Sequence, residues 1–382
     1  MNIIVHLGNG GAQELLVNYL RKFKDDDEFE YWVYVVEGPR KSKYNEIIQK
    51  EKLNVKYLNA PSEANAKTKV GWALRKFVGS FYIGKAIIDF RPDIIHTHIT
   101  QIYECALLPL IFLKSGIIFH TLHSNPNTYR GFDLLLAKAA FNLKKIIPVC
   151  INKKQMYNAK EHYNFKDAKL LYNSIDIHEI RKNMIVKEVA RKKYNIDKNA
   201  FVIGAVGRIS PVKNYSLLID IFVEVCKQKE NAVLLIIGNG DKKDILKKVK
   251  LSDLEDKVFF MGEVENPTHL YCAMDVYVNT SIRESCSLTT LEAQAVGINC
   301  VISAEVPDET IFTNHVCKIS LSTSVTEWAN QICFFQNNTI PFIKEESYTI
   351  EHNMRILKDM YKKEYCRKKV NARSCKYKSF VN

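Results

Sequence analysis

Residues 283–297 read RESCSLTTLEAQAVG, and they separate two short apolar segments of the chain. The segment before them reads MDVYVNT and ends at Thr280, and the segment after them reads INCVI over residues 298–302. The apolar segments predict strands, whereas Ser287 and Gly297 are typical first and last residues of a helix. The stretch therefore predicts a strand–loop–helix–strand unit of a parallel sheet, whose loop and helix start lie at the carboxyl edge, where ligands bind.

Two glutamates eight positions apart mark this unit, Glu284 in the loop and Glu292 in the helix. Unpaired N–H groups at the helix start suit a phosphate. Glu292 lies among apolar residues, so its carboxylate needs a strong hydrogen-bond donor. A vicinal diol such as a ribose is one candidate donor, and a nearby Lys or Arg is the other. The spacing alone leaves both open.

The whole stretch resembles the E-x7-E signature of the family-4 retaining glycosyltransferases, with further matches in AMDV (residues 273–276) and LEAQAVG (residues 291–297). The resemblance implies that Glu292 binds the nucleotide ribose and that Glu284 lies at the donor sugar. Ser285 and Ser287 depart from the family pattern, which usually carries Gly after the first Glu and often Pro two residues later. Because Ser tolerates a positive φ less well than Gly, these positions predict a reshaped or less active donor pocket.

The composition is that of a globular protein with two domains: 382 residues, 47% hydrophobic and 25% charged. The apolar run at residues 105–113 is too short to span a bilayer, and residues 1–5 lead directly into a strand, so we expect no secretory signal. Ten cysteines without a C-x-x-C pair predict reduced thiols in the cytoplasm rather than a disulfide framework or zinc site.

The net charge of +13 is concentrated in the tail, since residues 362–382 hold eight Lys or Arg and one Glu. A solvated tail is one interpretation, and attraction to an anionic membrane surface on the cytoplasmic side is another. Tail tyrosines could stack on nucleic acid, but no recognised binding module surrounds them, so we expect no nucleic-acid partner.

Short apolar runs alternate with amphipathic segments, which predicts parallel sheets wrapped by helices and an α/β fold. The expected strands are Asn2–His6, Tyr31–Val36, Val55–Leu58, Asp93–Thr97, Ile117–Leu122, Lys145–Val149, Phe201–Val206, Ala232–Ile237, Lys257–Phe260, Asp275–Asn279 and Ile298–Ile302. The expected helices include Ala12–Lys22, Lys69–Ile88, Tyr215–Lys227 and Lys242–Lys250.

Two such series in one chain predict two Rossmann-like domains facing across a cleft, the GT-B arrangement of the family. We expect an acceptor-binding domain over residues 1–172 and a nucleotide-sugar-binding domain over residues 173–345. Residues 346–382 then form a C-terminal segment with a basic tail. In the related fold its helix, here expected over Glu345–Lys363, crosses back to the first domain.

The first loop, LGNGGAQE over residues 7–14, follows a strand and opens a helix. It is not a dinucleotide fingerprint, because Gln13 stands where the third glycine would be. A tight turn and a close backbone approach to a ligand both explain Gly10 and Gly11. The resemblance places this loop near the donor phosphate and the acceptor.

Two histidine pairs follow, His96 with His98 and His120 with His123, and no Cys or carboxylate cluster completes a metal-ligand set around them. Histidines satisfied by backbone at strand ends explain either pair. The segment FHTLHS resembles the family's strand-then-His motif, and its match falls on His123, near the transferred sugar and the acceptor. Residues 125–130 are then candidates for acceptor contact.

Arg208 and Lys213 lie five residues apart on the loop after a strand of the second domain. Two cations on one loop suit a diphosphate, although ordinary surface charges at a helix start would look the same. Asn239 and Gly240 end the next strand, and Glu263 follows a further one. The resemblance implies that these two segments meet the base.

Together these features predict a retaining glycosyltransferase that moves a sugar, most simply from a UDP-sugar, to a glycan or lipid-linked acceptor in capsular, exopolysaccharide or lipopolysaccharide biosynthesis. The enzyme would need no metal and no cofactor, and would work in the cytoplasm, at the membrane surface if the tail binds lipid. A nucleotide-sugar 2-epimerase of the same fold and a non-catalytic nucleotide-sugar-binding partner subunit are the alternatives.

The expected catalytic residues are Glu284, His123, Arg208 and Lys213. The expected donor-binding residues are Gly10, Gly11, Arg208, Lys213, Asn239, Gly240, Glu263, Glu284, Ser287, Leu288, Thr289 and Glu292. The expected acceptor-binding residues are His98, His123, Asn125 and Arg130.

Overall fold

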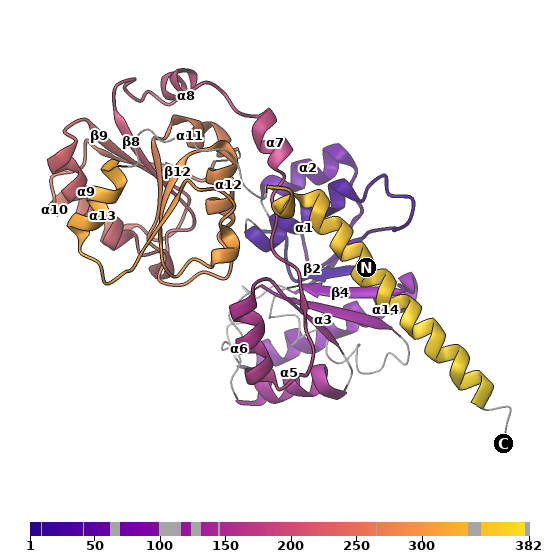
Figure 1. Cartoon of the computed structure of the whole chain (residues 1–382). Coiled ribbons are helices and arrows are strands. Elements are labelled where there is room, and N and C mark those ends of the chain that lie inside the picture. Colours follow the sequence, from indigo (N-terminus) through magenta and orange to yellow (C-terminus); the bar gives the residue numbers. More distant parts are fainter. Residues whose placement is uncertain are drawn as a thin grey trace. The chain divides into compact units, whose positions relative to one another are not determined.

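The computed structural model describes residues 1–8, 10–40, 42–61, 69–98, 116–123, 131–143, 146–264, 266–334 and 345–378. The chain forms two compact units, one made of Met1–Asn173 with Ile350–Asn382 and the other of Ser174–Thr349. Each unit contains a parallel sheet covered by helices (Figure 1). The predicted α/β class with two Rossmann-like domains is confirmed.

The first unit is built on a seven-stranded parallel sheet of order β3-β2-β1-β4-β5-β6-β7. The strands are β1 (Asn2–Ile4), β2 (Val33–Glu37), β3 (Val55–Ala60), β4 (Ile94–His98), β5 (Ile117–Leu122), β6 (Ile147–Cys150) and β7 (Lys169–Leu170). The helices are α1 (Gly11–Lys22), α2 (Lys43–Glu51), α3 (Lys69–Phe90), α5 (Gly131–Leu143), α6 (Lys153–Tyr163) and α14 (Ile350–Lys378).

Successive strand residues point to opposite faces, so both faces of this sheet need cover. Ile3 faces a core that includes Ile83 of α3 and Phe141 of α5. Ile4 faces a second core formed with Leu16 of α1 and residues of α14 such as Leu357. The C-terminal helix therefore packs on the first unit, as the family resemblance predicted, beside α1.

The predicted C-terminal helix was too short. A 3-10 turn over Glu345–Tyr348 precedes α14, and α14 continues to Lys378 instead of ending at Lys363. Residues 364–378 contain neither Gly nor Pro and are rich in Lys and Arg, so nothing in the sequence stops the helix.

The second unit contains a six-stranded parallel sheet of order β10-β9-β8-β11-β12-β13. The strands are β8 (Phe201–Val206), β9 (Ala232–Ile237), β10 (Val258–Gly262), β11 (Val276–Asn279), β12 (Asn299–Ser303) and β13 (Val316–Ile319). The helices are α7 (Ile177–Lys182), α8 (Lys187–Lys193), α9 (Tyr215–Gln228), α10 (Lys243–Leu251), α11 (Thr268–Ala273), α12 (Leu288–Val296) and α13 (Val325–Phe334), with 3-10 turns at Pro211–Lys213 and Asp308–Thr310.

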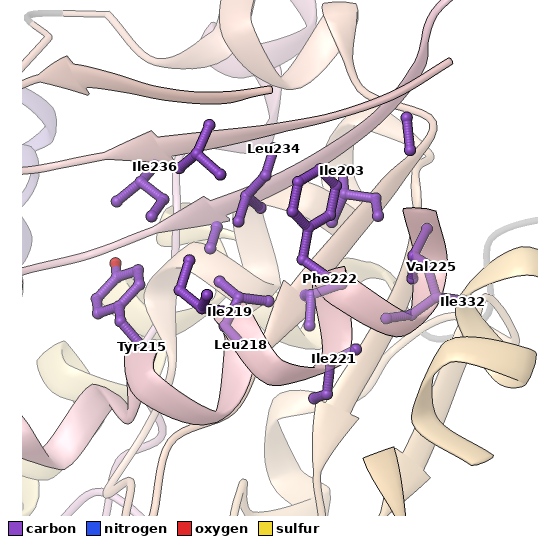
Figure 2. Close-up of a cluster of buried hydrophobic side chains, with 14 of the residues drawn as sticks. Ile203, Tyr215, Leu218, Ile219, Ile221, Phe222, Val225, Leu234, Ile236 and Ile332 are labelled. Atoms are coloured by element: carbon purple, nitrogen blue, oxygen red, sulfur yellow. The ribbon is translucent and has the colours of Figure 1, made fainter. Parts of the chain in front are cut away.

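Helix α9 covers one face of this sheet with an apolar stripe. Figure 2 shows Leu218, Ile219 and Phe222 of α9 directed at Ile203 of β8 and Leu234 of β9. All five side chains are at most 1% exposed. Because the sheet is fixed by packing on both sides, the ends of β8, β9 and β11 are rigid supports for the loops that follow them.

Candidate active site

The loops after β8 and β9 approach each other backbone to backbone. The N–H of Gly207 donates to the carbonyl of Ile237 at 2.9 Å, and the N–H of Ile209 donates to that of Asn239 at 2.9 Å. A Cβ on Gly238 would lie 2.1 Å from the carbonyl oxygen of Gly207, and one on Gly240 would lie 2.0 Å from that of Ile209. Only glycine fits at both positions, where φ is also positive.

Lys213 and Glu284 meet at this edge of the sheet. The Lys213 Nζ donates to Glu284 Oε1 at 2.6 Å, and the hydroxyl of Ser281 donates to the same oxygen at 2.9 Å. The side chains are 22% and 11% exposed. The structure thus brings together two residues that lie 71 positions apart and that the sequence assigned to the phosphate and to the sugar.

Two further contacts hold these loops together. The hydroxyl of Thr280 lies 3.1 Å from the carbonyl oxygen of Lys213 and 3.0 Å from that of Asn214. The N–H of Ile282 donates to the carbonyl of Val212 at 2.9 Å. The backbone after β11 is therefore fastened to the loop that carries Lys213, and the ion pair is preorganised by both loops.

Arg208, Asn239 and Glu263 lie on the loops after β8, β9 and β10, and all three are exposed. The amide of Asn239 donates to Glu263 Oε2 at 3.2 Å. Arg208 forms no ion pair within the residues that the structure describes. Its guanidinium is therefore available to an anion at the same edge of the sheet.

Helix α12 begins where the sequence predicted, with Ser287 before its first residue and Gly297 after its last at a φ of 88°. Ser287 does not cap the helix with its side chain. Its hydroxyl instead accepts from Asn279 at 3.1 Å and from Thr290 at 2.8 Å, and the residue is 2% exposed. The φ of Ser287 is −94°, and Ser285 also avoids the positive-φ region, so neither serine strains the loop.

Thr289, in the first turn of α12, is fixed by a tyrosine of the sheet. Its Oγ1 lies 2.8 Å from the hydroxyl of Tyr277, whose pKa is raised by burial, so that the phenol stays protonated. Leu288, between Ser287 and Thr289, packs in a small core with Leu291 and Ala295. Contacts with Tyr277 and with this small core therefore fix the first turn of α12. Its N–H groups lie at the start of the helix, next to the loop that carries Glu284.

Glu292 lies partly buried one turn further along α12, and its carboxylate accepts a hydrogen bond from the hydroxyl of Tyr271 at 2.8 Å. Burial and the neighbouring Glu292 raise the pKa of Tyr271 well above its ordinary value. Sequence reasoning missed Tyr271 and Ser281 as partners of the two glutamates. Tyr271 and Glu292 lie 21 positions apart, so no local pattern would have found this pair.

In the first unit, Gly10 precedes α1 and Gly11 is its first residue. A Cβ on Gly10 would lie 2.6 Å from Oε1 of Gln13, a flexible side-chain end. A side chain at position 10 would therefore require the end of Gln13 to move. These two glycines belong to a different unit from the other predicted donor-binding residues.

The histidines gather where β4 and β5 end. His98 is 3% exposed, and its Nδ1 lies 3.2 Å from Nε2 of His123. His96 contacts Tyr361 of α14 and Thr121 at 2.6 and 2.7 Å, and the Nδ1 of His120 lies 2.7 Å from the Thr97 hydroxyl. Burial lowers the pKa of His123 to about 4 and that of His120 to about 3. Asn125 and Arg130 lie outside the described residues.

No group of three His, Cys, Asp or Glu side chains among the described residues could hold a metal ion. No helix within the described ranges is long and apolar enough to cross a membrane.

The arrangement in the second unit has the chemistry of a phosphate site. Two cations, Arg208 and Lys213, and the N-terminal turn of α12 lie at the carboxyl edge of a parallel sheet. Two carboxylates, Glu284 and Glu292, lie on the strand–loop–helix segment that contains α12. Two Rossmann-like units, with the C-terminal helix returned to the first, define the GT-B fold class.

The chain is similar to known glycosyltransferases. Residues 186–349 match the family described as "Glycosyl transferases group 1". EpsF of Bacillus subtilis, named as a glycosyltransferase, is 23% identical over 381 residues, which cover 94% of this chain and 95% of that protein. The matched segment covers most of the second unit, and the similarity to EpsF extends over almost the whole chain, so both findings support a transferase enzyme.

Further similarities extend to defined enzymes and solved structures. An Escherichia coli UDP-Gal:alpha-D-GlcNAc-diphosphoundecaprenol alpha-1,3-galactosyltransferase is 23% identical over 55% of this chain and 57% of its own length. HepE of Anabaena, solved with UDP-glucose, has a TM-score of 0.72 at 15% identity and covers 97% of this chain and 98% of its own. A glycosyltransferase of Rickettsia africae reaches a TM-score of 0.73 at 16% identity, over 95% and 97% of the two chains.

Proposed function

We propose that this enzyme transfers a sugar, with retention of anomeric configuration, from a UDP-sugar to a glycan or lipid-linked acceptor in the synthesis of a cell-surface polysaccharide. The Lys213–Glu284 pair at the edge of the second sheet is the observation that carries the proposal. The galactosyltransferase of E. coli named above, which uses UDP-Gal, and the HepE complex with UDP-glucose support the choice of UDP.

The proposed donor site assigns the charges of the second unit to parts of a nucleotide sugar. Arg208, Lys213 and the N–H groups at the start of α12 would hold the diphosphate. Cleavage of the anomeric bond leaves negative charge on that diphosphate, and fixed cations and amides typically stabilise such charge by several kcal/mol. These groups come from the protein, so we propose catalysis without a metal ion or cofactor.

The two glutamates take different roles in this proposal. Glu292, held by Tyr271, would accept hydrogen bonds from the ribose hydroxyls, and Asn239, Gly240 and Glu263 would line the base. Glu284, held by Ser281 and Lys213, would orient the sugar. The acceptor would attack from the face that the diphosphate leaves, with the donor phosphate taking its proton, so Glu284 is not the nucleophile.

Residues of the first unit complete the proposal. Gly10 and Gly11 would approach the donor phosphate, and His123, Asn125 and Arg130 would contact the acceptor. His123 would also lie near the transferred sugar. Lipopolysaccharide synthesis is supported by the likeness to WaaG, described as a glycosyltransferase involved in lipopolysaccharide biosynthesis, with a TM-score of 0.67 at 13% identity.

Calorimetric titration with UDP tests the donor site. We expect UDP to bind, and we expect Lys213→Ala and Glu292→Ala each to weaken binding by about 1–3 kcal/mol, the cost of losing a charged hydrogen bond. Lys227→Ala, which removes an exposed lysine of α9 paired with Glu224, is the matched control and should leave binding unchanged. Chelation of divalent cations should also leave UDP affinity unchanged.

Two outcomes would contradict the proposal. Full UDP affinity in both site variants would show that this edge of the sheet is not the donor site, and equal affinity of GDP and UDP would overturn the choice of a UDP-sugar. Product analysis with the tightest-binding UDP-sugar then separates the alternatives: transfer to an acceptor, an epimerised nucleotide sugar, or binding without turnover.

A further inference from the structure

A chain of hydrogen bonds links β1 to the histidines at the end of β4 and β5. It begins at Asn2, whose Nδ2 donates to the carbonyl of Trp32 at 3.3 Å. A carbonyl only accepts, so the amide nitrogen must face Trp32 and the amide oxygen must face the other way. That oxygen lies 3.2 Å from Nε2 of His98, and Asn2 is 2% exposed.

The direction of the next bond follows from the chemistry of the groups. An amide oxygen has no proton to give, so Nε2 of His98 carries the proton that Asn2 accepts. A neutral imidazole has one N–H, which leaves Nδ1 of His98 as an acceptor. Its partner at 3.2 Å is Nε2 of His123, which must therefore be the donor.

Both rings are neutral in the folded protein at neutral pH. Burial, and then the neighbouring histidines, hold the pKa of His98 well below its usual range, and burial lowers the pKa of His123 to about 4. The rings of His96 and His98 are also stacked, with their centroids 4.3 Å apart, which disfavours a positive charge on both. With one proton per ring, the proton on Nε2 of His123 leaves its Nδ1 with a lone pair.

We propose that Asn2 and His98 are positioning residues that hold His123 in the Nε2–H tautomer, so that His123 offers Nδ1 to the substrate as a hydrogen-bond acceptor. The ligand class is a hydroxyl donor, and a sugar hydroxyl is the ligand if the function proposed above is correct. His98 then acts through His123 instead of touching the acceptor itself, which changes the role predicted for it from the sequence.

This tautomer has a consequence for the reaction. A neutral Nδ1 can accept a hydrogen bond from a sugar hydroxyl, and in the function proposed above its lone pair would favour the positive charge that develops on a sugar ring as the leaving group departs. A protonated His123 would do neither, because both nitrogens would be donors and the ring would repel that charge.

The tautomer can be measured directly on the full-length enzyme. Long-range 1H–15N spectra of protein labelled at the rings of its ten histidines distinguish protonated from unprotonated nitrogens, and His123→Gln assigns the signals. At neutral pH we expect Nε2 of His123 to be protonated and its Nδ1 to be unprotonated. An Nδ1–H tautomer or a charged ring in the unmodified enzyme would overturn the proposal, and this measurement needs no variant of Asn2.

A pair of variants tests the role of Asn2. Asn2→Leu keeps the size of the side chain and removes its acceptor, so we expect His123 to populate both tautomers. Thr121→Val is the matched control, because it removes a buried hydrogen bond to the neighbouring His96 and leaves the chain from Asn2 intact. An unchanged His123 spectrum in folded Asn2→Leu would exclude Asn2 as a positioning residue.

A titration with substrate distinguishes a failure of this inference from a failure of the proposed function. Titration of the labelled enzyme with a UDP-sugar should shift the Nδ1 signal of His123 if a sugar hydroxyl binds there. A fixed tautomer without that shift would leave the hydrogen-bond chain standing and would exclude a sugar hydroxyl as the partner of His123.

Discussion

Gly238 lies where two loops of the second unit leave no room for a side chain. Its φ is 137°, and a Cβ there would lie 2.1 Å from a backbone oxygen. We expect Gly238→Ala to lower the free energy of unfolding of the second unit by about 1–3 kcal/mol from backbone strain, with a further cost from the clash. Because Gly238 borders the loop of Lys213, the UDP affinity should fall as well.

Gly116→Ala is the control for that prediction, to be compared by denaturant unfolding. Among the described residues, a Cβ on Gly116 would meet only the Ile118 side chain, at 3.9 Å, an ordinary contact. Equal stability of the two variants would show that the loops after β8 and β9 can separate without cost.

At the scale of elements, α14 combines two surfaces. One face of its first half is buried, with Leu357 and Tyr361 at 1% and 4% exposure, whereas Lys363, Lys368 and Val370 on the second half are exposed. Figure 1 shows α14 as the long yellow helix near the C-terminus. We propose that its basic second half attracts an anionic membrane surface, at about 1 kcal/mol per basic residue near the lipid.

Sedimentation with vesicles tests this role of α14. We expect binding to vesicles that contain phosphatidylserine and not to vesicles of phosphatidylcholine, and we expect salt to reduce it. Exchange of Lys363 and Lys368 for Glu should abolish binding, while the same exchange at Lys243 and Lys250 of α10 should not. Binding that is indifferent to salt and to these exchanges would rule out an electrostatic role for α14.

At the scale of the whole molecule, the two units should respond differently to acid. The first unit buries four histidines whose pKa values burial lowers, to about 3 for His120, about 4 for His123, and well below the usual range for His96 and His98. In the unfolded chain each would bind a proton below about pH 6.5. Unfolding therefore takes up protons, and stability falls as the pH drops from about 6.5 toward about 4.

The slope of the first unit's stability against pH can be predicted and measured. Inside that window, each of these histidines lowers the free energy of unfolding by about 1.4 kcal/mol for every unit by which the pH falls. We expect hydrogen exchange, corrected for intrinsic rates, to show loss of protection in β4 and β5 at a higher pH than in β8 and β9. His98→Gln should flatten the slope of the first unit. Protection of β4 and β5 that stays constant between pH 7 and pH 5 would contradict the prediction.

Local sequence signals predicted most of the elements. Ile117–Leu122, Phe201–Val206 and Ala232–Ile237 are strands with the predicted bounds, because runs of apolar residues buried on both faces are continuous in the sequence. The short edge strands β7 and β13 were missed. Lys169–Leu170 has only two residues, and Val316–Ile319 includes a lysine, so neither carries a strong pattern.

The sequence by itself determined the α/β class, the two sheets, the start and end of α12, and the residue types at the edge of the second sheet. These depend on periodicity, caps and glycines, which act over a few neighbouring residues. Only the tertiary structure decided which side chains meet: Lys213 with Glu284, Tyr271 with Glu292, and Asn2 with His98. Such pairs depend on strand order and on packing across the sheet, which bring together residues that lie between 21 and 96 positions apart.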